Sequence, residues 1–400
     1  MTLNFSPSGE RIHISFFGKR NAGKSSLVNA ITDQELSVVS DVKGTTTDPV
    51  KKSMELLPLG PVVIIDTPGF DDEGNLGKKR VNKTNDVLNK TDIAVLVIDS
   101  EKGITFEDKS FIQLFSERNL PFIIAYNKSD LVKNIPEVGF NEIYVSALNK
   151  LNIEQLKTKI ASLVKNLPKS KPIIDDLINL GDLIVLVTPI DASAPKGRLI
   201  LPQQITLRNI LDNNCTAIVC KENELKKTLD MLNKKPDLVI TDSQAFGYVN
   251  KIIPEDVKLT SFSIIFARYK GDLEELVKGA SILKNLQEGD KILISEGCTH
   301  HRQCNDIGTV KMPQWINKFS DKNISFDFTS GGEFPDDLNK YRLVVHCGGC
   351  MLNEKEMQNR IEKCKDAGVP IVNYGVAIAM MHGILKRSLE VFPKILEILD

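Results

Sequence analysis

Eight residues near the N-terminus have the spacing of a phosphate-binding loop. Residues 18–25 read Gly-Lys-Arg-Asn-Ala-Gly-Lys-Ser and fit G-x-x-x-x-G-K-[ST], between a strand predicted over 11–17 and a helix predicted over 26–31. Glycines let backbone N–H groups wrap a β-phosphate at a helix N-terminus. The lysine charge suits the β- and γ-phosphates, and the serine hydroxyl suits Mg²⁺. The pattern predicts a nucleotide site at Gly18, Asn21, Ala22, Gly23, Lys24, Ser25 and Ser26.

Three further polar segments follow in the order expected of a guanine-nucleotide site. Asp66, at the end of a predicted strand, is expected to hold Mg²⁺ through a water, with the Gly69 N–H near the γ-phosphate. The carboxylate of Asp130 can accept hydrogen bonds from guanine N1–H and N2–H₂, a pair that adenine lacks. A backbone N–H in 146–148 is expected near guanine O6. The predicted residues are Asp66, Gly69, Asn127, Lys128, Asp130, Ser146, Ala147 and Leu148.

Cysteine and histidine gather at two predicted strand ends in the last third of the chain. Cys298 and His300 follow a strand predicted over 291–295, and His346, Cys347 and Cys350 close a strand predicted over 342–346. Parallel strands end at one edge of a sheet, so the two groups can converge. Three cysteines suit an iron–sulfur cluster with one iron lacking a cysteine, and equally a Cys₃His zinc site.

Other interpretations of these residues stay open at this point. The C-x-x-C pair could be a redox dithiol, and Cys304 is a reserve ligand. His300 and His346 are either metal ligands or hydrogen-bond partners of ligands. The remaining cysteines are expected to be small buried hydrophobes: Cys215, Cys220 and Cys364.

The elements that must position these residues alternate between short β-rich runs and helical patterns. This alternation predicts an α/β fold: a P-loop domain with a mostly parallel sheet over 1–167, then two further Rossmann-like α/β units over 173–267 and 268–400. A proline-containing basic segment over 167–172 is the expected linker. Whether the last two units form one larger sheet is left open. Strands are predicted at 62–66, 94–99, 122–127, 143–146, 183–188, 217–220, 238–241, 259–265, 324–329 and 371–373, besides those given above.

Composition narrows the class of protein. The 400 residues carry a net charge of −1, so no overall basic field attracts nucleic acid, which is not an expected partner. The apolar runs are far shorter than the ~20 residues of a membrane-spanning helix, and the N-terminus lacks the pattern of a signal peptide. A cytoplasmic location is therefore expected, where cysteines are thiols or metal ligands.

The nucleotide motifs resemble those of the translation-factor-related GTPases, particularly the branch that includes Era and MnmE. The resemblance implies that residues 44–48 form the first switch, with Thr46 as a Mg²⁺ ligand, although position 47 is threonine where those relatives often carry arginine. Phe70 stands where a water-orienting glutamine occurs in Ras-type proteins, which implies slow intrinsic GTP hydrolysis. Asn21 occupies a position that helps to bind K⁺ in that branch; the alternative is a tolerated loop residue. The implied catalytic residues are Lys24, Thr46 and Asn21.

The cysteine pattern, combined with the GTPase motifs, resembles that of the HydF family of [FeFe]-hydrogenase maturation GTPases over essentially the whole chain. The resemblance implies that Cys298, Cys347 and Cys350 ligate a [4Fe-4S] cluster whose fourth iron is open or holds an exchangeable ligand. It also implies a homodimeric scaffold, which receives a transient diiron precursor from the radical-SAM maturases HydE and HydG and delivers it to apo-[FeFe]-hydrogenase.

The rival hypothesis is a GTPase of the Era or MnmE kind that acts on RNA or ribosomes, with a structural zinc domain. It requires an RNA-binding module, such as a KH domain with a G-x-x-G loop, and a basic surface. The second half of the chain shows neither clearly, since 51 Lys and Arg balance 52 Asp and Glu over the whole sequence.

Overall fold

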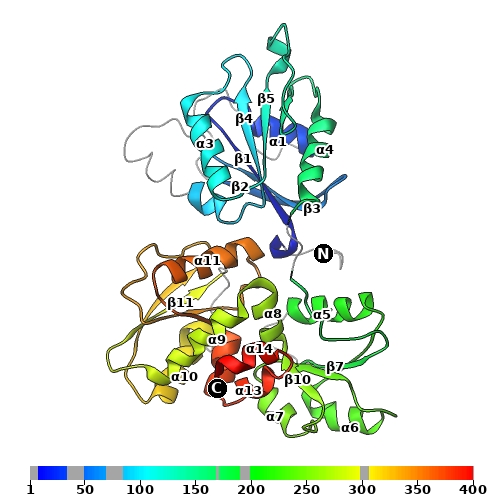
Figure 1. The fold of residues 1–400 in the computed structure, drawn as a ribbon, viewed down its shortest axis with the longest axis vertical. Helices are drawn as coiled ribbons and strands as arrows, with labels where there is room; N and C mark the ends of the chain where they lie inside the picture. Colours follow the sequence, from blue (N-terminus) through cyan, green and yellow to red (C-terminus); the bar gives the residue numbers. More distant parts are fainter. Residues whose placement is uncertain are drawn as a thin grey trace. The chain divides into compact units, whose positions relative to one another are not determined.

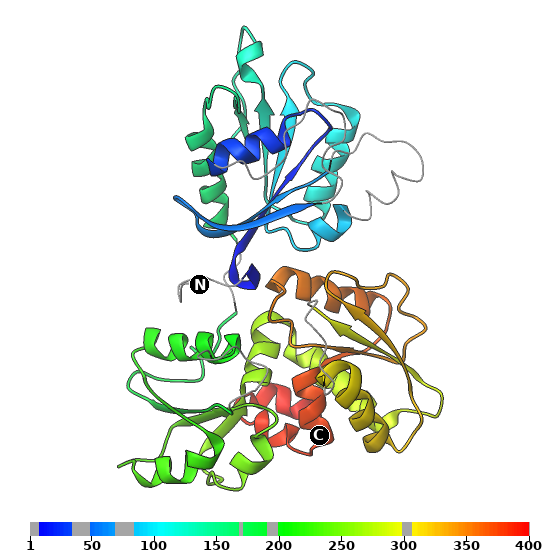
Figure 2. The same ribbon diagram turned by 180° about the vertical axis from the view of Figure 1, so that it is seen from behind.

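The computed structural model describes residues 8–33, 49–68, 84–167, 171–189, 199–297 and 306–399. The chain divides into two compact units, Met1–Lys169 and Ser170–Asp400 (Figures 1 and 2). The division falls within the linker predicted over 167–172.

The first unit is built on a six-stranded sheet of order β2-β3-β1-β4-β5-β6. Every neighbouring pair is parallel except β2 and β3. The parallel pairs confirm the prediction of a mostly parallel sheet in this part of the chain. The antiparallel strand β2 was not predicted, because its lysines and exposed positions carry no apolar signal. The strands are β1 (Ile12–Phe17), β2 (Val50–Leu56), β3 (Gly60–Asp66), β4 (Ile93–Asp99), β5 (Phe122–Asn127) and β6 (Glu142–Tyr144).

Helices cover both faces of this sheet, as Figure 1 shows. Successive residues of a strand point to opposite faces, so Phe16 packs into one apolar core with Leu27 and Leu156, while Phe17 packs into another with Phe111. Both sides of β1 and β4 are therefore buried, which explains why these strands are almost continuously apolar. The helical segments are η1 (Ser8–Glu10), α1 (Lys24–Thr32), α3 (Phe106–Glu117), η2 (Ser129–Leu131) and α4 (Ile153–Val164).

The second unit contains two separate four-stranded parallel sheets, of order β10-β9-β7-β8 and β12-β11-β13-β14. The alternative of one larger sheet does not occur in the described residues. The strands are β7 (Leu183–Val187), β8 (Thr216–Cys220), β9 (Leu238–Thr241), β10 (Lys258–Ser261), β11 (Lys291–Glu296), β12 (Ser325–Ser330), β13 (Leu343–His346) and β14 (Ile371–Asn373).

One strand prediction in this unit was partly wrong. The apolar run predicted as a strand over 259–265 leaves the sheet at Ser261, whose Oγ accepts a hydrogen bond from Ile264 N at 3.3 Å and caps helix α8. The helical segments are η3 (Glu222–Glu224), η4 (Ile282–Asn285), η5 (Ile307–Lys311), η6 (Glu397–Leu399), α5 (Leu201–Asp212), α6 (Leu225–Asp230), α7 (Phe246–Asn250), α8 (Phe262–Lys270), α9 (Leu273–Ser281), α10 (Met312–Ser320), α11 (Glu354–Asp366), α12 (Tyr374–Met381), α13 (Leu385–Ser388) and α14 (Pro393–Leu396).

The two sheets of the second unit share one hydrophobic core. Ile184 and Ile240 from the first sheet belong to the same buried cluster as Ile292 and Val344 from the second. Helices α8 and α9 contribute to it from the middle of the unit (Figure 1). A polar contact also joins the first of these sheets to a C-terminal helix, since Thr260 Oγ1 of β10 donates to Ser388 O of α13 at 2.8 Å. Among the described residues, no helix is long and apolar enough to cross a membrane.

Candidate functional site

The phosphate-binding loop joins β1 to α1 and leaves no room for a side chain at its second glycine. Gly23 has φ 84°, a left-handed conformation, and a Cβ there would lie 2.2 Å from Asn127 Nδ2. Asn127 Nδ2 instead donates to Ala22 O at 3.0 Å. Glycine at this position therefore lets the loop directly approach Asn127, in the segment predicted to bind the guanine base.

The two residues with the strongest predicted phosphate and Mg²⁺ roles follow that glycine. Lys24 is buried, and its Nζ donates to Gly18 O at 2.9 Å and to Lys19 O at 2.7 Å, which holds the ammonium group over the loop. Ser25 Oγ donates to Asp66 Oδ2 at 2.6 Å, so two predicted Mg²⁺ ligands are adjacent. This arrangement suits a Mg²⁺-bound triphosphate, whose oxygens can replace the carbonyl partners of Lys24.

Asn127 connects the two halves of the nucleotide site. Its Nδ2 bonds Ala22 O, and its Oδ1 accepts from Ala147 N at 3.0 Å. Next in sequence, Lys128 adopts a left-handed conformation with φ 63° and forms an ion pair with Asp99 at 2.7 Å. The sequence did not point to Asp99, because a single acidic residue at a strand end carries no motif.

The predicted guanine-binding residues lie together beside this connection. Ser146 Oγ donates to Asp130 Oδ1 at 2.5 Å and accepts from Asn149 N at 3.1 Å, which orients the Asp130 carboxylate. Leu148 is 84% exposed and its side chain has no hydrogen-bonding group, so the predicted contact to guanine O6 falls to the backbone. Asn21 is exposed on the loop with φ 61°.

Several predicted site residues lie outside the described residues. They include the first-switch segment 44–48 with Thr46, and Gly69 and Phe70 after β3. On the cysteine side they include Cys298, Cys304 and His300.

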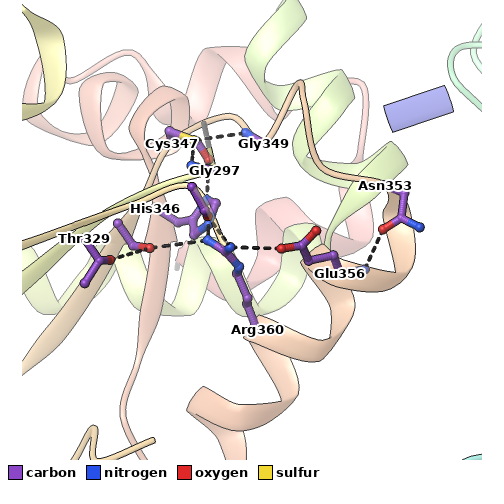
Figure 3. Close-up of polar contacts among 10 residues, drawn as sticks. Gly297, Thr329, His346, Cys347, Gly349, Asn353, Glu356 and Arg360 are labelled. Carbon is purple, nitrogen blue, oxygen red and sulfur yellow. Dashed lines mark hydrogen bonds and ion pairs between the residues drawn. The ribbon is translucent and has the colours of Figure 1, made fainter. Parts of the chain in front are cut away.

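The C-x-x-C segment lies at the carboxyl edge of its sheet, as predicted. Strands β11 and β13 are parallel neighbours, with Ser295 opposite His346, and Cys347 N donates to Ser295 O at 2.9 Å. The Cys347 sulfur receives backbone N–H groups from Gly297 at 3.0 Å and from Gly349 at 3.4 Å (Figure 3). Such donors stabilise a thiolate and tune the potential of iron–sulfur clusters.

The residues present fit a metal centre at this edge. Cys350 is exposed, and a Cβ placed on Gly348 would meet no atom within 4 Å, so the loop is open at Gly348, between its two cysteines. Cys298 lies outside the described part of the chain. Within the described part, no group of three or more His, Cys, Asp and Glu side chains could hold a metal ion. Cys347 and Cys350 thus provide two thiols suited to either zinc or a cluster.

His346 lies beneath this loop with both ring nitrogens engaged. Its Nδ1 is 2.7 Å from Cys347 O, and its Nε2 is 2.9 Å from Arg360 Nη1 (Figure 3). Since a carbonyl only accepts and a guanidinium only donates, the partners assign the proton to Nδ1. Complete burial, with the Arg360 charge, lowers the pKa of His346 to about 3.

Sequence reasoning missed three polar residues around this edge. Arg360 is buried on α11, and no motif marks it. Glu296 is buried at the end of β11, and Tyr374 donates to its Oε1 at 3.4 Å. Burial and the Glu296 carboxylate raise the pKa of the Tyr374 hydroxyl. By contrast, Cys364 is buried away from solvent, and burial raises its pKa to about 12, as expected of a structural thiol.

The loop after β1, Asp66 at the end of β3 and the Asn-Lys-Ser-Asp segment that begins at the end of β5 define the class: a P-loop GTPase domain. A family model described as 50S ribosome-binding GTPase matches residues 13–128. The models of the hydrogen maturase F dimerization and tetramerization domains match residues 173–271 and 274–391, more than half of the chain together. The chain belongs to the HydF family of hydrogenase maturases.

Individual relatives resemble the GTPase part. The tRNA modification GTPase MnmE of Nitrosomonas europaea is 34% identical over 156 residues, which are 38% of this chain and 34% of that protein. GTPase Der of Kosmotoga olearia is 36% identical over 137 residues, 32% of this chain and 31% of that protein. The chain thus spans about a third of the length of these relatives. The structure of Aquifex aeolicus Era bound to GDP and AlF₄⁻ matches with a TM-score of 0.35 and 19% identity, over 60% of this chain and 97% of that one.

Proposed function

We propose that this protein is a GTP-hydrolysing scaffold and carrier that binds a [4Fe-4S] cluster and delivers a diiron subcluster precursor to apo-[FeFe]-hydrogenase. The observation that carries the proposal is the Cys347 sulfur, which accepts two backbone N–H groups at a sheet edge. The match of this second unit to hydrogen maturase F domains supports the same proposal.

The first unit binds GTP in this proposal. Lys24 neutralises the β- and γ-phosphates, while Ser25, Thr46 and Asp66 hold Mg²⁺. The contact between Ser25 and Asp66 at 2.6 Å supports this assignment. Hydrolysis is slow, and K⁺ bound with the help of Asn21 accelerates it by adding positive charge near the phosphates.

The second unit carries the cluster. Cys298, Cys347 and Cys350 are its protein ligands, and the fourth iron stays available for an exchangeable ligand. A carrier must bind its cargo and then release it, and an open coordination position gives a labile attachment point. The chain acts as a homodimer in the cytoplasm, where GTP and reduced thiols are present. The match to a dimerization domain supports the dimer.

GTP hydrolysis does not perform the metal chemistry in this scheme. It reorders the switch segments and thereby changes the affinity for partners: HydE and HydG as donors of the diiron precursor, and the apo-hydrogenase as acceptor.

The cluster is tested by anaerobic reconstitution with iron and sulfide, followed by EPR after reduction. The wild type and Cys220→Ala should both give a reduced [4Fe-4S] signal, whereas Cys347→Ala should lose most of it. Cys220 is the matched control because it is half-buried on β8, in the other sheet of the same unit.

Two outcomes would change the assignment. Tightly bound zinc without a cluster signal would contradict the carrier function and favour the rival GTPase that acts on RNA or ribosomes with a structural zinc domain. An unchanged signal in Cys347→Ala would remove this cysteine from the ligand set.

A further inference from the structure

Arg360 joins the ends of three strands beneath the cysteine loop. Its Nη2 donates to Gly331 O, just after β12, at 2.8 Å and to Glu356 Oε1 at 3.1 Å. Its Nη1 lies 2.9 Å from His346 Nε2, at the end of β13, and 3.5 Å from Ser295 Oγ, near the end of β11. The side chain is 4% exposed.

The contacts of Arg360 continue to the sulfur through one histidine. His346 uses Nε2 to accept from Arg360 and Nδ1 to donate to Cys347 O at 2.7 Å. The Cys347 sulfur in turn accepts from Gly297 N and Gly349 N. A shift of the His346 ring would therefore move the backbone that carries the sulfur.

We propose that Arg360 is a positioning residue for the cysteine loop: it occupies Nε2 of His346, excludes that histidine from the metal ligands, and fixes the Cys347 carbonyl through Nδ1. This inference rests on the proposed function, since it concerns the ligands of the same metal centre. It assigns the second of the two roles that the sequence left open for His346.

The chemistry of the three groups supports this assignment. A metal ligand must offer a nitrogen lone pair, and the only lone pair of the Nδ1–H tautomer is on Nε2, where the guanidinium donates. Freeing it would leave a buried guanidinium N–H without its partner, which is costly. Arg360 also places its guanidinium 5.3 Å from the centre of the Phe334 ring, so its plane is fixed on a second side. Lysine offers one nitrogen and cannot make the same four contacts.

The first test asks whether His346 binds the metal. Full-length protein labelled with ¹⁵N-histidine is reconstituted, reduced and examined by pulsed EPR. Wild type and His346→Asn should show the same nitrogen couplings, because Asn can still donate to Cys347 O. A histidine coupling present in the wild type and lost in His346→Asn would overturn the inference.

The second test asks whether Arg360 positions the loop. Arg360→Met should lower the cluster content per chain at least tenfold or shift the g-values, and Arg360→Lys should restore them only in part. Arg268→Met is the matched control, since Arg268 also bonds two carbonyls and one aspartate in this unit and packs on Phe392. A wild-type spectrum and cluster content in Arg360→Met would overturn the inference.

A further variant distinguishes a folding defect of Arg360→Met from a defect in the position of the cysteine loop. If Arg360→Met does not fold, as judged by circular dichroism, His346→Gln replaces it. Gln can still accept from Arg360 but cannot donate to Cys347 O, so the link between Arg360 and the cysteine loop is broken and the g-values should shift from those of the wild type; a wild-type spectrum in this variant would overturn the inference. A wild type that takes up no cluster defeats the proposed function itself, whereas a normal cluster with unaffected variants defeats only the role of Arg360.

Discussion

Two buried histidines show how burial changes the pKa of a side chain in this protein. His13 in the first unit has its Nδ1 2.9 Å from Arg11 O, as His346 in the second unit has its own near Cys347 O. Burial lowers the pKa of His13 to about 4, with the nearby lysines Lys51 and Lys90 acting in the same direction. Both rings are therefore neutral in the folded protein at neutral pH.

His13 should make the folded protein sensitive to acid. The unfolded chain protonates this histidine near pH 6.5 and the folded chain only near pH 4, so the unfolded state binds more protons between these values. The free energy of unfolding should fall by about 2 kcal/mol from this group between pH 8 and pH 5. The free energy of unfolding of the wild type minus that of His13→Asn, measured by urea unfolding of the full chain, should be lower at pH 5 than at pH 8 by that amount. An equal difference at both pH values would contradict this explanation.

The residues that the sequence predicted correctly as neighbours belong to short motifs at strand ends. Ser25 and Asp66 could be paired in advance, because each motif has a known place at one edge of a parallel sheet. Arg360 could not be found in this way. Its partners Gly331 and Ser295 are 29 and 65 positions away, and a buried arginine has no local signature.

At the scale of elements, α9 approaches its sheet closely enough to exclude a side chain. A Cβ on Gly279 would lie 2.0 Å from Ile371 O of β14. The helix and strand backbones are therefore in direct contact, in the sheet that carries the cysteine loop. Gly247 on α7 provides a contrast, since a Cβ there would meet nothing within 4 Å.

These two helical glycines should respond to alanine with opposite signs. Gly279→Ala should destabilise the protein by about 1–3 kcal/mol, because the added methyl forces the helix away from β14. Gly247→Ala should stabilise it by up to about 1 kcal/mol through helix propensity alone. Thermal unfolding of both variants checks the pair, and a loss of stability of the same size in both would refute the packing argument.

The elements themselves were mostly predictable, and the exceptions have physical reasons. Buried parallel strands such as β4 are strong signals, because both faces need apolar residues. The run over 259–265 was ambiguous, since a short apolar segment fits a strand or a buried helix, and only the cap at Ser261 separates the two. Strand β2 pairs along one edge of its sheet, where polar residues are tolerated.

At the scale of the whole molecule, the division into two compact units predicts two unfolding transitions. The proposed nucleotide site lies in the first unit, so Mg²⁺ and GDP should raise the midpoint of one transition, with about 2.7 kcal/mol of added stability at 100 times Kd. Differential scanning calorimetry of the full chain measures this effect. Lys24→Ala should abolish the shift, and equal shifts in both transitions would contradict independent units.

The shared core of the second unit also bears on recombination between relatives. Ile240 and Ile292 belong to one buried cluster although they come from different sheets. In a chimera of two relatives with its breakpoint near residue 272, the two halves of this core would come from different proteins and would not be matched in packing. A breakpoint near residue 169 leaves the cluster intact, so the segment to exchange is the entire unit Ser170–Asp400.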